Sequence, residues 1–445
     1  MAKTRHEVRD GIHGFIEFNN LEKSLIDSMP FQRLRNIHQL ALTYQVYPGA
    51  THKRFEHSLG VMEVATRIFD RIFEGVSEKR LDSQVRDRIA EELEPDVRGY
   101  WRSVLRIAAL LHDVGHLPFS HAAEAELLPE GWDHERLTAE IIRHSEIAAI
   151  LRNAKPPIVP EDVIDVAYSV KDRNKHEPGF VLNPWKTLLN EIITGTTFGA
   201  DRIDYLLRDS WHVGVAYGRF DPDRLIDGLR LVIDPESDNI TLGLDNGGIH
   251  AAEALLLARY FMYTQVYFHD VRRVYDQHLQ DFLSAWLPGG KFPTAWEDLI
   301  KITDNEVLSA MSRALTDPAD PAGPLYKLAA RVMKRQHFRT VNTLVTSNKR
   351  KSPTIFDDVL IFAQETWGAE NVRFSKYGPK SEANNFLVLN DDGSVENSIQ
   401  ASGVIANLPP IEVGLIFVHP EHKLEAKKKI DARLKELLQE KTDGV

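Results

Sequence analysis

Residues 112–121 gather groups that can bind a metal ion and move protons, because they read His-Asp-Val-Gly-His-Leu-Pro-Phe-Ser-His. They follow an apolar run, Ile107–Leu111, which predicts the end of a buried helix. Buried imidazole and carboxylate groups are costly without partners, so packing alone does not explain so many of them in one place. The first two residues are candidate metal ligands, and His116 and His121 suit acid–base chemistry at a phosphate.

A complete metal site needs ligands from other parts of the chain. His112 and Asp113 are neighbours whose directions on a helix differ by about 100°, but a long and a short side chain can still reach one ion. Candidates for the other two ligands are His57, in Arg-Phe-Glu-His-Ser-Leu-Gly, and Asp201, in Gly-Ala-Asp-Arg-Ile-Asp-Tyr-Leu-Leu-Arg-Asp. Two His and two Asp suit Fe, Mn, Co, Ni or Zn better than Ca, and leave positions for a water and a phosphoryl oxygen. A lone His-Asp pair is common by chance, so the metal site depends on all three motifs.

Apolar spacing predicts the elements that must position these groups. Residues 18–335 are expected to be mostly helical, and Leu229–Leu244 is expected to form a β-hairpin inserted in the helical body. The predicted helices are Leu21–Met29, Phe31–Leu42, His57–Glu74, Val104–Asp113, His134–His144 and a long helix of about Gly248–Trp286.

The pattern changes beyond about residue 336, where short β-like runs alternate with helices. A small α+β C-terminal lobe is therefore expected over residues 336–445, after a helical core over residues 1–335 whose metal motifs span about 50–210. Its predicted strands and helices are Phe338–Val345, Phe356–Thr366, Val372–Tyr377, Phe386–Asn390, Val413–His419 and Glu421–Lys441.

Composition bounds the class of protein. With 445 residues, 43% hydrophobic and 27% charged, the chain fits a globular protein with a large core. It has no cysteine, so a metal must bind His, Asp or Glu, and a cytoplasmic setting is expected. Glu253 and Arg259 in the longest apolar stretch argue against a membrane span. The net charge of −11 argues weakly against nucleic-acid binding but permits a local cationic cleft for an anionic substrate.

Several blocks in register resemble the HD-domain phosphohydrolases. The match is closer still to the deoxynucleoside triphosphate (dNTP) triphosphohydrolases, which include a human enzyme with a sterile-alpha-motif domain. It covers about residues 7–280, and the C-terminal lobe matches only loosely. The blocks are Asp10-Gly-Ile-His-Gly, Phe31-Gln-Arg-Leu-Arg, Tyr47 to Gly60, Leu111 to His121, Asp133-His-Glu and Asp201 to Asp209.

The resemblance implies a role for each motif residue. It assigns the metal to His57, His112, Asp113 and Asp201, and places the other histidines around the phosphates. Water or hydroxide activated by the metal would attack the α-phosphorus while a protonated imidazole donates to the leaving 5′ oxygen. We expect His121 to be that acid, held protonated by Glu124 or Glu135. His134 is expected beside the phosphates, although it could simply cap its helix.

The resemblance also implies contacts to the rest of a nucleotide. Arg54 and Arg202 would bind phosphate, although each could instead form a salt bridge. Tyr205 and Asp209 lie four and eight residues after Asp201, on one helix face. Tyr205 would then contact the sugar, and Asp209 with Gln39 would bind the 3′-hydroxyl. Leu40 and Tyr275 would exclude a 2′-hydroxyl, or are simply core residues.

Two features depart from the family pattern or leave alternatives open. Tyr267 stands where the human relative has a further phosphate-binding arginine. An activating guanine-nucleotide site would use Asp27, Gln32 and Arg35, but the family's neighbouring Lys and Asn become His6 and Arg9 here, and Gln-Arg-Leu-Arg also has structural roles.

The expected fold is thus mainly α, an HD-domain helical core with an inserted β-hairpin and a small α+β C-terminal lobe. The expected activity is hydrolysis of dNTPs to deoxynucleoside and triphosphate, with one transition metal and Mg²⁺ on the phosphates. The expected assembly is a homo-oligomer, a dimer or tetramer, with dGTP or another nucleotide as a possible activator. The alternatives are an HD phosphohydrolase acting on monophosphates or cyclic nucleotides, and a nucleotide-sensing or nucleic-acid-binding scaffold.

Overall fold

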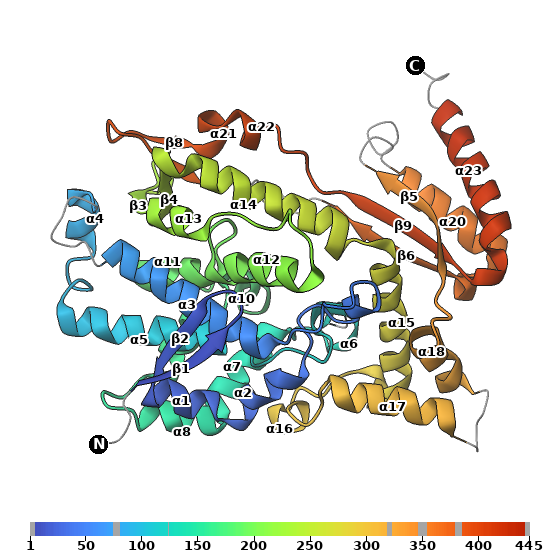
Figure 1. The fold of residues 1–445 in the computed structure, drawn as a ribbon, viewed down its shortest axis with the longest axis horizontal. Helices are drawn as coiled ribbons and strands as arrows, with labels where there is room; N and C mark the ends of the chain where they lie inside the picture. Colours follow the sequence, from blue (N-terminus) through green and yellow to red (C-terminus); the bar gives the residue numbers. More distant parts are fainter. Residues whose placement is uncertain are drawn as a thin grey trace.

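The computed structural model describes residues 5–73, 81–122, 124–317, 323–345, 354–378 and 385–440. Within these ranges the side chains of residues 121, 125, 344, 345 and 440 are not described. The described chain is dominated by helices, with small sheets at the N-terminus, on the inserted hairpin and in the C-terminal region (Figure 1).

Three helices form the centre of the helical body: α3 (Arg54–Phe73), α5 (Pro95–Leu111) and α12 (Ala200–Val213). α3 packs against both of the others, and α12 runs through the middle of the body in Figure 1. α5 begins at Pro95, whose missing N–H costs nothing in a first helical turn. α12 ends at Gly214, whose φ of 81° forms a left-handed cap. These local signals set where the helices that carry the metal motifs begin and end.

The other helices cover this centre or belong to the C-terminal region. They are α1 (Asn20–Ile26), α2 (Met29–Arg33), α4 (Ser83–Arg88), α6 (Glu124–Leu127), α7 (His134–His144), α8 (Glu146–Arg152), α9 (Pro160–Ala167), α10 (Val170–His176), α11 (Pro184–Thr194), α13 (Pro222–Gly228), α14 (Ile249–Phe261), α15 (Asp270–Trp286), α16 (Trp296–Leu299), α17 (Asp304–Thr316), α18 (Pro324–Met333), α20 (Ile355–Trp367), α21 (Ser398–Ala401), α22 (Gly403–Ala406) and α23 (Lys423–Glu440). None of the helices in the described ranges is both long and apolar enough to cross a membrane.

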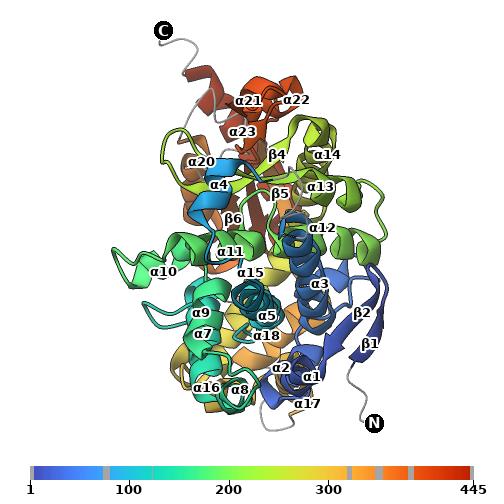
Figure 2. The same cartoon turned by 90° about the vertical axis from the view of Figure 1, so that its left-hand side faces the viewer.

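Three small sheets complete the fold. β1 and β2 form an antiparallel N-terminal hairpin beside α3 (Figure 2). β3 and β4 form the inserted hairpin, and β4 pairs in parallel with β7, so strands from both sides of residue 336 share one sheet. In the third sheet β9 lies between β5 and β6, and α20 and α23 contribute to the apolar cluster at this sheet. The strands are β1 (Arg5–Asp10), β2 (Gly14–Asn19), β3 (Leu229–Ile233), β4 (Ile240–Asp245), β5 (Arg339–Val345), β6 (Val372–Tyr377), β7 (Leu387–Leu389), β8 (Val395–Asn397) and β9 (Val413–Val418).

The mainly helical fold class with an inserted hairpin and C-terminal strands is confirmed. The domain boundary after residue 335 stays a prediction. The helix predicted over Phe31–Leu42 is wrong beyond its first turns, because α2 ends at Arg33 and only a 3₁₀ turn comes after it. There His38 N–H donates to Asp304 Oδ2 at 2.7 Å and Gln39 N–H donates to His52 O at 3.0 Å. Tertiary hydrogen bonds thus replace the helical ones.

The long helix predicted over about Gly248–Trp286 is also interrupted. α14 continues into a π-helix over Met262–Tyr267, and α15 starts at Asp270. Phe268 N–H donates to Tyr263 O at 3.0 Å, a five-residue bond that accommodates the extra residue. The chain then leaves helical geometry at His269, with ψ of 127°. Tyr267 is the last residue of this π-helix.

Replacing Gly60 with alanine is expected to destabilise the fold. A Cβ there would lie 1.9 Å from Asp204 Oδ1 and 2.4 Å from Arg208 Nη2, so two buried charged groups would have to move. Such overpacking costs about 1–3 kcal/mol, measured as the free energy of unfolding in urea. Gly99→Ala is the matched control: it lies in α5 with no atom within 4 Å of its Cβ, and should be neutral or stabilising. Equal unfolding free energies for the two variants would contradict this explanation.

Candidate metal centre

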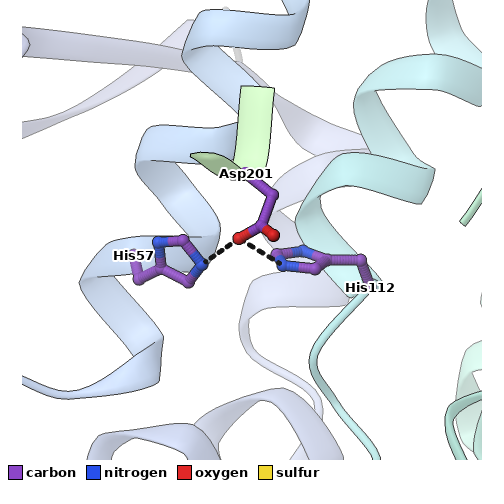
Figure 3. A group of neighbouring side chains, drawn as sticks. All are labelled: His57, His112 and Asp201. Carbon is purple, nitrogen blue, oxygen red and sulfur yellow. Dashed lines mark hydrogen bonds and ion pairs between the residues drawn. The ribbon is translucent and has the colours of Figure 1, made fainter. Parts of the chain in front are cut away.

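The structure brings together the four residues predicted as metal ligands. His57 comes from the first turn of α3, His112 and Asp113 come directly after α5, and Asp201 lies in the first turn of α12. Asp201 Oδ1 lies 3.0 Å from His57 Nε2 and 3.8 Å from His112 Nε2, between the two imidazole rings (Figure 3). Asp113 Oδ1 lies 3.3 Å from His112 Nε2, and its Oδ2 lies 3.7 Å from His57 Nε2. Two helix starts and one helix end thus converge on one small volume.

His112 has its outer nitrogen free to bind an ion. Its Nδ1 is 2.8 Å from the Ala109 carbonyl, which can only accept, so Nδ1 carries the hydrogen and Nε2 of the neutral ring does not. Nε2 is buried, and no described residue gives it a hydrogen bond. A buried acceptor without a partner is unfavourable by itself, and a metal ion would satisfy it.

Charge in and around this cluster also favours a divalent cation. The groups joined to the cluster by ion pairs are four carboxylates and two guanidinium groups: Asp10, Asp113, Asp201, Asp204, Arg54 and Arg208. With neutral histidines this set has two negative charges in excess, which one divalent ion would neutralise. Imidazole and carboxylate donors together suit a transition metal. The residues present therefore fit a divalent metal ion.

The electrostatics of the metal-free side chains reflect the same excess of negative charge. Burial alone would lower the pKa of His57, but hydrogen bonds with Asp201 and Asp204 raise it to about 10. Burial alone would raise the pKa of Asp113, but the charge of Arg54, with that of a protonated His57, holds it well below its usual range. Asp113 is therefore ionised at neutral pH and available as a ligand, and a metal ion competes with a proton on His57.

A second cluster adjoins the first through Asp113. His116 Nε2 lies 3.5 Å from Asp113 Oδ1, and the His116 ring stacks on that of His134 with centroids 4.0 Å apart. This contact requires Gly115, since a Cβ there would lie 2.4 Å from the His134 carbonyl oxygen. The first turn of α7 can therefore pack directly against the loop after the ligands.

His134 is held as a charged imidazolium. Its Nδ1 lies 2.5 Å from Glu124 Oε1, which also accepts from its backbone N–H at 2.9 Å. Burial alone would lower the pKa of His134, but the charge and hydrogen bond of Glu124 raise it to about 10. Burial raises the pKa of Glu135 to about 8, although it accepts a hydrogen bond from Ser169 N–H. The side chain of His121 lies outside the described part of the structure, so its pairing with Glu124 or Glu135 stays a prediction.

The two arginines predicted to bind phosphate have different surroundings. Arg54 contacts the Asp113 carboxylate through Nη1 and donates from Nε to Ser120 Oγ at 2.7 Å. Its charge is therefore paired with a carboxylate of the cluster. Arg202 comes directly after Asp201, and its Nε and Nη1 are buried with no hydrogen-bond partner among the described residues. Buried guanidinium N–H groups without partners fit an anion better than a salt bridge within the chain.

The residues predicted to contact the sugar lie on one side of α12. Asp209 is buried, with Oδ1 2.7 Å from His52 Nε2 and Oδ2 2.6 Å from the Tyr267 hydroxyl. The Tyr205 and Tyr267 rings are 6.3 Å apart. Gln39 is joined to this group through its backbone bond to His52, and its Oε1 is buried without a partner in the described chain. Tyr267 thus contacts Asp209, the residue expected to bind the 3′-hydroxyl.

The other predicted substrate and activator residues lie in two further places. Leu40 is buried in the core, and so is Tyr275, whose ring centroid is 4.9 Å from that of His337. Asp27 comes directly after α1, Gln32 lies in α2, and Arg35 lies in the 3₁₀ turn after α2, where its Nε donates to Gln32 Oε1 at 2.9 Å. Their roles as a steric wall and an activator site stay predictions.

Sequence reasoning missed a network behind His57. Asp204 and Arg208 lie in the same block as Asp201, and Asp10 and His13 lie in the Asp-Gly-Ile-His-Gly block, yet these residues were given no role. Spacing of four between Asp204 and Arg208 on a helix was the available signal. His52, in the block before His57, was missed in the same way.

Comparison with known proteins agrees with this arrangement. The chain matches the model of the HD domain over residues 54–207 and that of the HD associated region over residues 220–355. A crystal structure of a hypothetical protein from Aquifex aeolicus has a TM-score of 0.73 and 32% sequence identity, covering 96% of this chain and 100% of that one. The helical core, the group of candidate metal ligands and these matches together define the class of protein. The chain belongs to the HD-domain phosphohydrolase family.

Curated relatives include both uncharacterised proteins and nucleotide hydrolases. An uncharacterised protein of Methanocaldococcus jannaschii is 38% identical over 270 residues, 60% of this chain and 47% of that protein. The deoxynucleoside triphosphate triphosphohydrolase SAMHD1 of Bos taurus is 30% identical over 349 residues, 71% of this chain and 55% of that protein. SAMHD1 of Homo sapiens is 28% identical over 372 residues, 76% of this chain and 54% of that protein. The chain spans about half the length of these curated relatives.

Proposed function

We propose that this protein hydrolyses deoxynucleoside triphosphates to deoxynucleoside and inorganic triphosphate. The observation that carries the proposal is one face of α12. It presents Asp201 at the metal cluster, the buried N–H groups of Arg202 beside it, the Tyr205 ring one turn on and the buried Asp209 two turns on. A nucleotide needs such a series of contacts, for phosphate, sugar and hydroxyl. The activity for which the SAMHD1 relatives are named supports the same substrate.

The side chains divide the reaction between them. Arg202 would hold phosphate oxygens, and Asp209 with Gln39 would bind a sugar hydroxyl. Water adds to the α-phosphorus and releases a proton to solvent as the bond from phosphorus to the 5′ oxygen breaks. In place of His121, the acid expected from the sequence, we assign the proton donor for that oxygen to the His134 imidazolium, because Glu124 pairs with it. His57, His112, Asp113 and Asp201 would hold the metal. When bound, such an ion lowers the pKa of water and polarises a phosphoryl oxygen.

Assembly and activation form part of the proposal. The proposal includes a homo-oligomer and an activating nucleotide at Asp27, Gln32 and Arg35, where the side chains of Asp27 and Arg35 are exposed. Mass photometry with and without dGTP tests the oligomer. Activity that appears only in dNTP mixtures would identify an activator.

Product analysis tests the proposed reaction. The protein, supplied with Mn²⁺ and Mg²⁺, is incubated with each dNTP and with their mixture, and the products are separated by ion exchange. Deoxynucleoside and triphosphate are expected in equal amounts. Release of phosphate or pyrophosphate would contradict the proposal. Turnover of only monophosphates or cyclic nucleotides would favour the other HD phosphohydrolase class, and binding of single-stranded DNA without turnover would favour a scaffold.

A further inference from the structure

The turn of the N-terminal hairpin points two side chains into the protein. Asp10 ends β1, and its Oδ1 accepts from the backbone N–H groups of Ile12 and His13, each at 2.9 Å. Gly14, with φ of 78°, then starts β2. This geometry holds the turn closed and sends the His13 side chain toward α12, where only 4% of it is exposed.

His13 contacts the carboxylate that holds a metal ligand. His13 Nε2 lies 2.6 Å from Asp204 Oδ1, and His57 Nδ1 lies 2.7 Å from Asp204 Oδ2. Asp204 therefore connects the hairpin turn to His57 directly. Because a carboxylate can only accept, His57 Nδ1 carries a hydrogen and its Nε2 faces Asp201.

Arg208 ties the same groups together. Its Nε and Nη2 each donate to Asp204 at 2.9 Å, and its Nη1 donates to Asp10 Oδ2 at 2.8 Å. All four members of the network, Asp10, His13, Asp204 and Arg208, have side chains less than a tenth exposed. Asp204 thus accepts from three side chains at once, and its position depends on the hairpin turn as well as on α12.

We propose that the N-terminal hairpin turn, through His13 and Asp10, is a positioning element that sets the affinity of the centre for a divalent metal. The inference rests on the metal centre of the proposed function. Partners of a ligating histidine fix its ring orientation and basicity, and their loss typically costs about 10- to 100-fold in metal affinity. Without His13, Asp204 loses one of its donors and can turn away from His57.

Metal titration tests this role without relying on turnover. Co²⁺ is titrated into metal-free protein, its visible absorption bands are recorded, and its affinity is measured against a chelator. His13→Ala is expected to bind Co²⁺ about 10- to 100-fold more weakly and with shifted bands. His13→Gln should recover most of the affinity, because its amide N–H can reach Asp204 as Nε2 does. Glu7→Gln, at an exposed position of the same hairpin, is the matched control and should bind as the wild type does.

The outcomes separate this inference from the proposed function. If the wild type binds no Co²⁺, both fail. If the wild type binds it and His13→Ala binds within about twofold, only the positioning role fails, since far larger losses result from the removal of such partners. If metal-free His13→Ala fails to fold, the test is made with His13→Gln instead. A folded His13→Gln protein that binds Co²⁺ about 10- to 100-fold more weakly than the wild type would overturn the positioning role, because its amide should replace the bond to Asp204.

Discussion

Replacing His112 with alanine is expected to abolish metal binding and to reduce hydrolysis of dNTPs by about 10³-fold or more. The ion stabilises transition-state charge by several kcal/mol, and each 1.36 kcal/mol is about tenfold in rate. His112 offers a buried Nε2 with no hydrogen-bond partner in the described chain, so alanine removes a ligand atom without leaving a new unpaired donor there. Metal content by mass spectrometry and kcat with each dNTP measure the two effects.

The fold should survive this substitution. Among the described contacts of this side chain, alanine removes the hydrogen bond between His112 Nδ1 and the Ala109 carbonyl, worth about 1 kcal/mol, and the contacts of Nε2 with Asp113 and Asp201. The matched control is His144→Ala, an exposed histidine that pairs with Glu140 at 3.5 Å on α7, and it should keep wild-type metal content and activity. A His112→Ala protein with full activity would remove His112 from the metal centre.

Helix positions were predictable where apolar spacing and caps act locally. The helix predicted over His134–His144 matches α7, whose Asp133 side chain caps the Arg136 N–H as its type suggests. The predicted helices also placed His57 at the start of one helix and His112 near the end of another, while a site shared with Asp201 was implied by the order of the family motifs. Structure that depends on residues within one helical turn of each other could thus be inferred from the sequence.

Features that depend on partners far away in the sequence could not be predicted. The helix predicted over Phe31–Leu42 fails because His38 donates its backbone N–H to Asp304, 266 positions away. The spacing of apolar residues gives no information about that contact. The break before α15 was missed as well: the pattern across residues 248–286 is helical throughout, yet the chain forms a π-helix over Met262–Tyr267, and its last residue bonds to Asp209. Rare backbone geometry of this kind is often found at functional sites.

The network behind His57 was missed for a different reason. Its residues were visible in the motifs, but a buried Asp–Arg pair on a helix is ordinarily interpreted as a salt bridge. Only the structure shows that Asp204 also accepts from His57 and His13. The role of a buried carboxylate, in the fold or at the metal centre, is therefore inferred from its hydrogen-bond partners and not from its residue type.

Replacing Glu124 with glutamine is expected to move the alkaline limb of the pH–rate profile downward. The Glu124 carboxylate raises the pKa of His134 to about 10, so the wild type keeps this acid protonated through neutral pH. Glutamine removes the charge, and burial then drives the pKa of His134 below its present value. Loss of a general acid costs about 10²–10⁴-fold, so kcat at pH 8 should fall by about 10²-fold and recover partly as the pH is lowered. Glu126→Gln, an exposed position on the same short helix, is the matched control.

The same pair makes stability depend on pH in a defined direction. Because the pKa of His134 is raised from 6.5 to about 10 on folding, the ion pair stabilises the fold fully below about pH 6.5, and this contribution is lost as the pH rises through about 10. The wild type should therefore unfold progressively more easily in urea as the pH rises from about 6.5 to about 10, with no further change from this pair above that, and Glu124→Gln should lack this dependence.

Double variants distinguish His134 from His121 as the proton donor. If Glu124 acts through His134, the losses in kcat from Glu124→Gln and His134→Asn should be far from additive, because one variant already removes what the other would. His121→Asn should then add its effect independently. Additive losses for Glu124 and His134, with non-additive losses for Glu124 and His121, would transfer the general acid to His121. In either case the paired carboxylate keeps an imidazole charged at the pH where the leaving oxygen needs a proton, which an unpaired buried histidine could not do.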